Sequence, residues 1–449
     1  MSDSALRHIP HVPATPGFGH TLQFLRDPYA LHRRSRAACG PIYRTRILGM
    51  WRVTLGGPDA VDHVLRDPDR IFSSAEGNDI LHPIFTGGLP VRDFDDHRAH
   101  RRIMQAAFRR TAMEGYVRRI VAQSGAMVDS FPVGRPFRFA PAIKEAVLDM
   151  GGQVLMGLEV GSDELRALNA LFIDEVNGCM GIVRRPLPFT RMRRGLRAKA
   201  DFEARMRALI PERRRTGGAD FFSQMCRARD EDGAGWTEQE IVEHFNFLLL
   251  AGHDTSASAL SSTLWGVAGA APEWQDALAE EAATAHPRLM AALEDGDTAA
   301  MQAALADMPR TEWALKEALR LYPPAPFVSR RALRGFTWDG VTIPEGTQLS
   351  VPLAMVMVDP DLWREPERFD PARFDPTHGD APGHPGAWVP FGGGAHKCIG
   401  MHFAYHEVKV VLAALLARYR VELPGPAPRW TFVPVARPLN GLPVILHPR

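Results

Sequence analysis

The sequence predicts a mainly α-helical fold with a small β-rich region, an α+β arrangement. Over most of the 449 residues, apolar side chains recur at three- and four-residue spacing among Ala, Leu, Arg and Glu, which is typical of helices that bury one face. Runs rich in Ile, Val, Thr and Tyr are confined to two short patches, near residues 40–56 and 335–355. Between these patches, a helical pattern starts after Thr237 and meets no proline before Pro272. One helix of about 30 residues, about 45 Å long, is therefore expected to cross the molecule.

The composition is that of a soluble globular protein. With 45% hydrophobic and 23% charged residues, the chain can bury a large core. The 53 Lys and Arg residues nearly balance the 52 Asp and Glu residues, so the net charge of +1 gives no overall attraction to nucleic acid or to an anionic membrane. Charges and prolines interrupt the first 33 residues, and no apolar run reaches the roughly 18 residues of a membrane span. We therefore expect no signal peptide and no membrane anchor.

The cysteines indicate a reducing compartment. Cys39, Cys179, Cys226 and Cys398 are widely separated and form no Cys-x-x-Cys pair, so neither a disulfide framework nor a structural zinc site is predicted. The expected location is the cytoplasm. No internal repeat and no long low-complexity linker divides the chain, which predicts a single domain over residues 1–449.

The β-rich patches are predicted to be hairpins that come together. Two strand-like runs within residues 42–55 flank Leu48-Gly49, and two shorter runs flank Asp339-Gly340. A further strand is expected over residues 347–353, after a turn at residues 344–346. We expect the two patches to share one small sheet.

The long central helix carries its own start signal. Thr237 is followed three residues later by Glu240, which is the signature of a capping box. Further along, Gly252 and Thr255 stand in the helix interior, where glycine costs backbone entropy and a threonine hydroxyl competes for backbone hydrogen bonds. A functional reason for these two residues is therefore worth considering.

A glycine-rich loop with one cysteine carries the sharpest chemical signal. Residues 391–400 read Phe-Gly-Gly-Gly-Ala-His-Lys-Cys-Ile-Gly and lead directly into a helical run from Met401. Backbone N–H groups and the positive end of the helix favour a thiolate at Cys398, and the glycines let the main chain approach a flat ligand closely.

The spacing of Phe391, Gly394, Cys398 and Gly400 resembles the cysteine loop of the cytochrome P-450 superfamily, Phe-x-x-Gly-x-x-x-Cys-x-Gly. The resemblance extends over the whole chain, as far as a loop at residues 438–443. It implies the cytochrome P-450 fold, with a long central helix over a buried haem b (iron protoporphyrin IX), Cys398 as the iron ligand, and no fused reductase.

Other segments resemble the family pattern in the family's order. Glu317 and Arg320 stand one turn apart on one helix face, and Pro366-Glu367-Arg368-Phe369 resembles the loop whose arginine joins them. The resemblance implies a buried structural triad of Glu317, Arg320 and Arg368, with no catalytic role.

The segment Ala251-Gly252-His253-Asp254-Thr255 resembles the family's oxygen-activation segment. The resemblance implies that Thr255 hydrogen-bonds the bound dioxygen, that Asp254 relays protons from solvent, and that Ala251 faces the haem. The residues expected to line the substrate pocket are Phe247, Leu250, Ala251, Phe327, Val328 and Leu439. Their apolar character does not separate terpene, steroid, fatty acid, aromatic and polyketide substrates.

Four basic side chains resemble the family's residues that hold the two haem propionates. These are His97, Arg101, Arg330 and His396. His100 and Arg331 stand beside two of them, and we favour His97 and Arg330 over these neighbours.

Arginines recur along residues 101–119, among them Arg109 and Arg110, and Lys397 lies in the cysteine loop. By resemblance, electrons arrive at the haem face nearest the cysteine, where this basic surface would attract an acidic ferredoxin or flavodoxin served by its own reductase. An ordinary charged helix face is the alternative.

The expected activity is that of a haem-thiolate monooxygenase, which inserts one atom of O2 into a C–H bond or alkene of an apolar small molecule. Two alternatives stay open. A peroxide-driven peroxygenase would share the cysteine loop, but Asp254-Thr255 argues against it. A haem sensor or carrier would need no proton relay and would usually carry an output module, which the sequence does not show.

Overall fold

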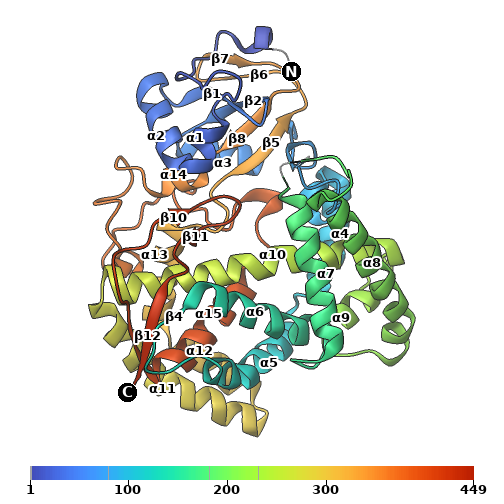
Figure 1. Cartoon of the computed structure of the whole chain (residues 1–449), viewed down its shortest axis with the longest axis vertical. Coiled ribbons are helices and arrows are strands. Elements are labelled where there is room, and N and C mark those ends of the chain that lie inside the picture. Colours follow the sequence, from blue (N-terminus) through green and yellow to red (C-terminus); the bar gives the residue numbers. More distant parts are fainter. Residues whose placement is uncertain (1–2, 79, 182, 231) are drawn as a thin grey trace.

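The computed structural model of the protein describes residues 3–78, 80–181, 183–230 and 232–449. Figure 1 shows a helical body with a smaller β-rich end. In this part of the chain the α-helices are α1 (Thr21–Arg26), α2 (Pro28–Cys39), α3 (Pro58–Arg66), α4 (Phe94–Ala106), α5 (Arg110–Asp129), α6 (Phe139–Met156), α7 (Asp163–Cys179), α8 (Arg191–Thr216), α9 (Phe221–Arg227), α10 (Glu238–Trp265), α11 (Glu273–Asp295), α12 (Thr298–Ala306), α13 (Pro309–Leu321), α14 (Leu353–Met357) and α15 (Met401–Leu416). The strands are β1 (Ile42–Ile47), β2 (Met50–Leu55), β3 (Phe72–Ser73), β4 (Phe137–Arg138), β5 (Val328–Ala332), β6 (Phe336–Trp338), β7 (Val341–Ile343), β8 (Gln348–Val351), β9 (Tyr419–Glu422), β10 (Trp430–Thr431), β11 (Arg437–Pro438) and β12 (Pro443–Pro448).

The predicted long helix is α10, which runs across the helical body (Figure 1). The predicted capping box is present, because the Thr237 hydroxyl accepts from the Glu240 backbone N–H at 3.3 Å and the Glu240 carboxylate accepts from the Thr237 N–H at 2.8 Å. The helix has 28 residues and passes into a π-helical turn, Gly266–Ala270, before Pro272. Its predicted extent is confirmed.

The two predicted β-rich patches share one sheet, with strand order β1-β2-β8-β5-β3. The hairpin β1–β2 turns at Leu48-Gly49, and β2 pairs in parallel with β8, with Val53 opposite Leu349. The strands around Asp339-Gly340 form a separate two-stranded sheet, β6–β7. Both residues of that turn have positive φ, which explains the glycine. In Figure 1 this region lies with α1 to α3 at one end of the molecule.

Several strands were not predicted from the sequence. β5 extends the main sheet, and a second sheet with the order β4-β12-β9 brings the C-terminal strand next to β9. β4, β10 and β11 have only two residues each. Such short runs show too few alternations for a period of two to stand out.

The α15 helix lies in the core of the helical body. Its residues 407–416 are all buried, and it packs against α5 and α11. The stretch Gly394–Leu416, which contains α15, is long and apolar enough to cross a membrane by length and composition alone, with 56% of its most apolar window buried inside the fold. This burial is what a core helix of a globular domain shows.

The buried ion triad forms with a different third member from the one predicted. Arg320 donates to both carboxylate oxygens of Glu317, at 2.7 and 2.9 Å, and both side chains are fully buried. The second guanidinium on Glu317 is that of Arg373, with Nε 3.3 Å from Oε1 and a side chain only 2% exposed. Arg368 is 59% exposed, pairs with Glu365, and contributes only its backbone carbonyl to Arg320.

Arg368 and Arg373 stand in two copies of one short sequence pattern. Pro-x-Arg-Phe occurs at residues 366–369 and again at residues 371–374. The second copy forms a 3-10 turn, Pro371–Phe374, which turns Arg373 inward. The sequence offers two nearly equal candidates, and only the tertiary structure distinguishes them.

Candidate functional site

Cys398 lies in the loop between a 3-10 turn, Gly394–His396, and the start of α15. Its backbone N–H donates to the Phe391 carbonyl at 2.9 Å, which fixes the loop. Gly394 has φ +59°, and a Cβ there would lie 1.9 Å from the Leu65 carbonyl oxygen of α3. Only glycine allows this approach, so the glycine pattern of the loop has a steric cause.

The electrostatics around the thiol differ from the sequence-based expectation. Burial raises the pKa of Cys398, although the Gly400 backbone N–H and the positive charges of Arg101 and Lys397 lower it. The loop alone therefore does not hold a free thiolate. A bound cation would change this, because a coordinating thiol is deprotonated by its metal ion.

A cavity of about 330 Å³ opens above the Cys398 thiol. Its walls come from α4, α10, the chain before and within β5, and the cysteine loop. The predicted site residues that line it are His97, Arg101, Phe247, Ala251, Phe327, Val328, Arg330, His396 and Cys398. The structure thus brings most of the predicted set to one place.

The basic groups of this cavity are short of partners. Arg330 is 5% exposed, and among the described residues it donates only to the carbonyl of Ser329, at 2.8 Å. Burial lowers its pKa to about 10, although Asp93 and Asp67 raise it. Burial also lowers the pKa of Arg101, which forms no ion pair within the described ranges. A buried guanidinium group without a carboxylate, such as that of Arg330, is costly, so the cavity is suited to a ligand with anionic groups.

The rings of the two histidines of the predicted set lie against each other at an interplanar angle of 36°. The rings of His97 and His396 have centroids 3.9 Å apart. His97 is 1% exposed, and its Nε2 is buried without a hydrogen-bond partner in the described part of the chain. Burial lowers the pKa of His97 to about 4, so the ring is neutral near pH 7 and can donate one N–H to a ligand.

These features fit haem. Two propionates would meet the Arg101 and Arg330 guanidinium groups and the unpartnered His97 nitrogen, while the glycine loop would face the flat ring from the thiol side. Within the described ranges, no group of three or more His, Cys, Asp or Glu side chains is arranged to hold a metal ion.

Neither predicted proton-handling residue, Asp254 or Thr255, is among the residues that line the thiol cavity. The Thr255 hydroxyl donates to the Ala251 carbonyl at 2.5 Å, within the helix. Asp254 forms an ion pair at 2.5 Å with Lys144 of α6. It lines a second cavity, of about 260 Å³, together with Arg138, Lys144, Ser258, Arg437 and Leu439.

Two predicted pocket residues are not among the lining residues of the thiol cavity. Leu250 packs against the main hydrophobic core, and Leu439 lines the second cavity with 58% of its surface exposed. By contrast, His244 lines the thiol cavity but was not predicted. It shares a helical face with Phe247 and Ala251, so the periodicity of α10 was the signal that could have identified it.

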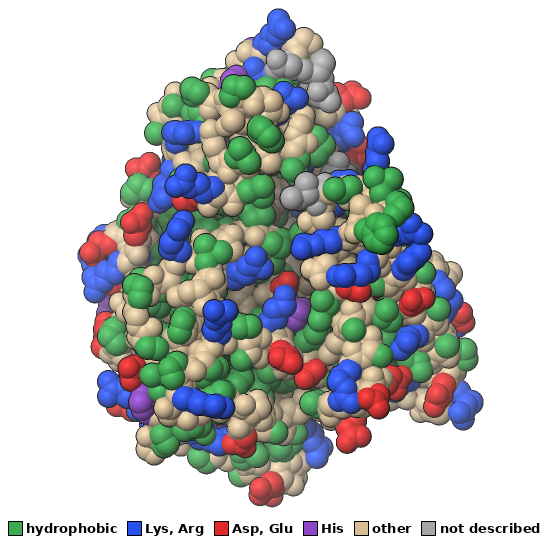
Figure 2. All heavy atoms as spheres, viewed as in Figure 1, with side chains coloured by type: hydrophobic (Ala, Val, Ile, Leu, Met, Phe, Trp, Pro, Cys, Tyr) green, Lys and Arg blue, Asp and Glu red, His purple; other side chains and the backbone are tan. Residues whose placement is uncertain are grey.

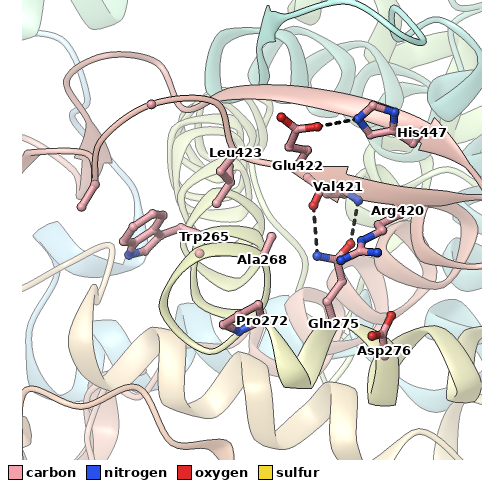
Figure 3. Close-up of a pocket in the computed structure, with 13 residues that line it drawn as sticks. Trp265, Ala268, Pro272, Gln275, Asp276, Arg420, Val421, Glu422, Leu423 and His447 are labelled. Carbon is pink, nitrogen blue, oxygen red and sulfur yellow. Dashed lines mark hydrogen bonds and ion pairs between the residues drawn. The ribbon is translucent and has the colours of Figure 1, made fainter.

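A larger cavity, of about 840 Å³, lies at the far end of α10 (Figure 3). None of the predicted site residues is among the 13 that line it. Three of its polar side chains are engaged: Glu422 and His447 form a contact of 2.8 Å, and the Gln275 side chain donates to the Val421 carbonyl and accepts from the Val421 N–H. This cavity therefore has no reactive group comparable to the thiol.

The predicted basic surface is smaller than the sequence suggests. Arg101 lines the thiol cavity, and Arg102 pairs with Asp230 at 2.7 Å. Arg109 and Arg110 are exposed, and a depression beside the cysteine loop includes Arg66 and Lys397. On the face seen in Figure 2, Lys and Arg side chains alternate with Asp and Glu over much of the surface.

Comparisons with known proteins agree with this site. The family model described as Cytochrome P-450 matches residues 10–437. A Mycobacterium tuberculosis protein named cytochrome P-450 136 is 32% identical, over 99% of this chain and 90% of its own. Cyclooctat-9-en-7-ol 5-monooxygenase of Streptomyces melanosporofaciens is 29% identical, over 92% of this chain and 89% of its own. A cyanobacterial cytochrome P-450 solved with bound retinoic acid superposes with a TM-score of 0.83 at 26% identity, covering 98% of this chain and 100% of its own.

Proposed function

The chain belongs to the cytochrome P-450 family, and from this premise we propose that Cys398 is the axial ligand of its haem b. As a member of that family the protein is a haem-thiolate monooxygenase that uses O2, a separate source of electrons and a hydrophobic substrate. Haem held by a cysteine thiolate supplies the oxygen chemistry, with the thiolate donating electron density that favours cleavage of the O–O bond.

Cys398 is supported as the ligand by its place in the cavity. It is the cysteine among the lining residues, and the glycines beside it leave room for a flat ring. Once the thiol has lost its proton, the Gly400 N–H and the charges of Arg101 and Lys397 stabilise the anion.

The propionates would be held by His97, Arg101, Arg330 and His396. The buried Arg330 and the half-buried Arg101 supply positive charge, and the His97 Nε2 supplies a donor that has no partner among the described residues. Each contact would satisfy a group that is otherwise buried at a cost.

Asp254 and Thr255 would carry protons across α10. Asp254 lies on the second cavity, where it forms an ion pair with Lys144. Thr255 is the next residue and lies on the same side of the helix as Ala251. Its hydroxyl donates a hydrogen bond to the Ala251 carbonyl. Releasing that carbonyl would free the hydroxyl to donate into the thiol cavity.

The substrate would be an apolar, terpenoid-sized molecule with one polar group, oxidised by hydroxylation or epoxidation. The cavity wall away from the propionate site is apolar, with Phe247, Leu248, Ala251, Phe327 and Val328. Two relatives are named with molecules of this kind: one is a monooxygenase of cyclooctat-9-en-7-ol, and another was solved with bound retinoic acid. Both compounds are hydrocarbon skeletons with a single polar function.

The electrons would come from a ferredoxin or flavodoxin with its reductase, in the cytoplasm. The depression beside the cysteine loop contains Lys397 and an ion pair of Arg66 with Asp62, and Arg109 and Arg110 add exposed positive charge at the start of α5. The four cysteines are all free thiols, which suits a reducing compartment.

One observation carries this proposal: the Cys398 thiol shares a cavity with two arginines, the buried Arg330 and the half-buried Arg101, that form no ion pair with a carboxylate of the described residues. The test is an absorbance titration of the purified ferric protein with apolar compounds, including retinoic acid and a cyclic diterpene alcohol. We expect a thiolate-type haem spectrum that shifts to high spin with one chemical class. Cys398→Ala should lose the thiolate-type spectrum, and a wild-type protein that takes up no haem would refute the proposal.

The role of Thr255 is tested separately. In Thr255→Ala, we expect electron consumption to continue while hydroxylated product falls and hydrogen peroxide rises, because proton delivery fails. Full coupling of electrons to product in this variant would remove the role given to Thr255. Turnover that proceeds equally well with added peroxide alone would favour the peroxygenase alternative.

A further inference from the structure

Two buried histidines join α4 to α10 beside the thiol cavity. His100 of α4 and His244 of α10 are hydrogen-bonded through Nδ1 and Nε2, at 2.8 Å. His100 is 8% exposed and His244 is 1% exposed. His244 is itself part of the cavity wall, and His100 stands next to Arg101 and one turn after His97. The pair therefore adjoins the residues proposed to hold the propionates.

The surroundings define where the hydrogens lie. The Nε2 of His100 is 3.4 Å from the Asp96 carboxylate and 3.4 Å from the Glu240 carboxylate, so this nitrogen carries the hydrogen. Its Nδ1 is then an acceptor, and the His244 Nε2–H is the donor. The Nδ1 of His244, which has no partner within the described ranges, is left as a bare lone pair. The neutral pair thus has one arrangement that leaves no N–H unpaired.

A tryptophan and an ion pair complete this junction. The Trp236 ring stacks on His244, with centroids 4.7 Å apart and an interplanar angle of 25°, and lies 6.4 Å from His100. Arg102 ties the same loop to α4 through Asp230.

A proton disturbs the pair. If His100 becomes cationic, its Nδ1–H must donate to His244, whose remaining hydrogen moves to Nδ1, where the described residues offer no acceptor. A second proton leaves no acceptor between the rings. Burial lowers the pKa of both histidines, so both are neutral near pH 7. The charged or titratable groups that face them are Arg92, Asp96, His97, Glu240 and Glu243.

We propose that His100 and His244 are positioning residues: their neutral hydrogen-bonded pair holds α4 against α10, so that His97 and Arg101 stay in place for the haem propionates, and acid releases this contact. The inference rests on the proposed roles of His97 and Arg101. On this inference, the histidine pair controls the rate at which haem is lost and the dependence of that rate on pH.

The test measures the rate at which haem leaves the ferric holoprotein for excess apomyoglobin, followed by Soret absorbance between pH 5 and pH 8. Wild type should lose haem slowly at pH 7.5 and faster as the pH falls below about 6.5. His100→Leu should lose haem about fivefold faster at pH 7.5, the effect of one hydrogen bond. His100→Gln keeps a polar partner for His244 without a titrating group, so it should restore the slow rate at pH 7.5 and shift the acid acceleration to lower pH.

His286→Gln is the matched control, because His286 is a half-buried histidine on α11 whose pKa is also lowered by burial. It should reproduce the wild-type profile. Identical pH profiles for wild type and His100→Gln, or a wild-type rate for His100→Leu at pH 7.5, would overturn the inference. Failure of the proposed function itself would appear differently, as a wild-type protein without a thiolate-type haem spectrum.

Discussion

Arg320 and Arg330 both have buried guanidinium groups, yet among the described residues only Arg320 forms an ion pair with a carboxylate. Arg320 donates to Glu317 twice and to the carbonyls of Met357, Pro366 and Arg368. Arg330, in the described part of the chain, donates only to its neighbour's carbonyl. A buried cation that the protein neutralises itself belongs to the scaffold, whereas one left without a counter-charge indicates a ligand that brings the charge.

Removing the Glu317 carboxylate should cause the largest loss of stability. Glu317→Ala leaves Arg320 and Arg373 buried without their acid, which should cost about 3 to 5 kcal/mol in the free energy of unfolding. Urea denaturation measures this loss. Arg373→Ala should also be strongly destabilising, while Arg368→Ala should change stability by less than about 1 kcal/mol because that side chain is exposed. Equal losses for the two arginine variants would contradict the assignment of Arg373 to the triad.

Replacing Arg330 should have the opposite effect on the stability of the haem-free protein. In Arg330→Met, the haem-free protein should unfold at the same or a higher urea concentration than wild type, since an uncompensated buried charge is gone. The holoprotein should lose haem at least about tenfold faster, since a hydrogen bond from a charged donor is lost. Arg320→Met is the control and should destabilise both forms. A haem-free Arg330→Met protein that is much less stable than wild type would place Arg330 in the scaffold.

A buried acid extends the comparison to negative charge. Glu175 of α7 is fully buried, accepts from Asn246 Nδ2 of α10 at 2.6 Å, and forms no ion pair within the described ranges. Burial raises its pKa to about 7, above its unfolded value. The acid is therefore neutral in the folded protein at pH 5, and stability is lost as the pH rises from about 4.5 toward 7.

Glu175→Gln should remove this loss. Between pH 5 and pH 8, wild type should lose about 2 to 3 kcal/mol more of its free energy of unfolding than the variant does. Urea denaturation at the two pH values measures the difference, and Glu164→Gln, an exposed acid on the same helix, is the control. A pH dependence that is the same in Glu175→Gln and wild type would refute the assignment.

The smallest effect concerns charges at the surface. Reversing Arg109 and Arg110 to Glu should slow reduction by an acidic ferredoxin several-fold at low salt, and this difference should vanish at high salt. Stopped-flow reduction measures the rates, with Arg215→Glu on α8 as a control for net charge. Unchanged reduction kinetics at low salt would show that these arginines lie outside the partner's docking surface.

The features that could be predicted from the sequence are those whose cause is local. The capping box of α10, the Leu48-Gly49 hairpin and the glycine loop around Cys398 each depend on residues a few positions apart. Pairing between distant segments could not be predicted. Lys144 and Asp254 are 110 positions apart, and the contact between His100 and His244 exists only because α4 approaches α10. The choice between Arg368 and Arg373 failed for a further reason, because both stand in the same short pattern.

The closeness of Gly394 to Leu65 has a consequence for how the molecule can be divided. Leu65 belongs to α3, at the β-rich end, while Gly394 opens the loop that carries the thiol. The gap between them leaves no room for one methyl group. The β-rich end thus forms part of the surface against which the thiol loop packs. A fragment truncated to the helical body would keep every residue from Phe391 to Gly400 and still lack the surface that gives them their shape.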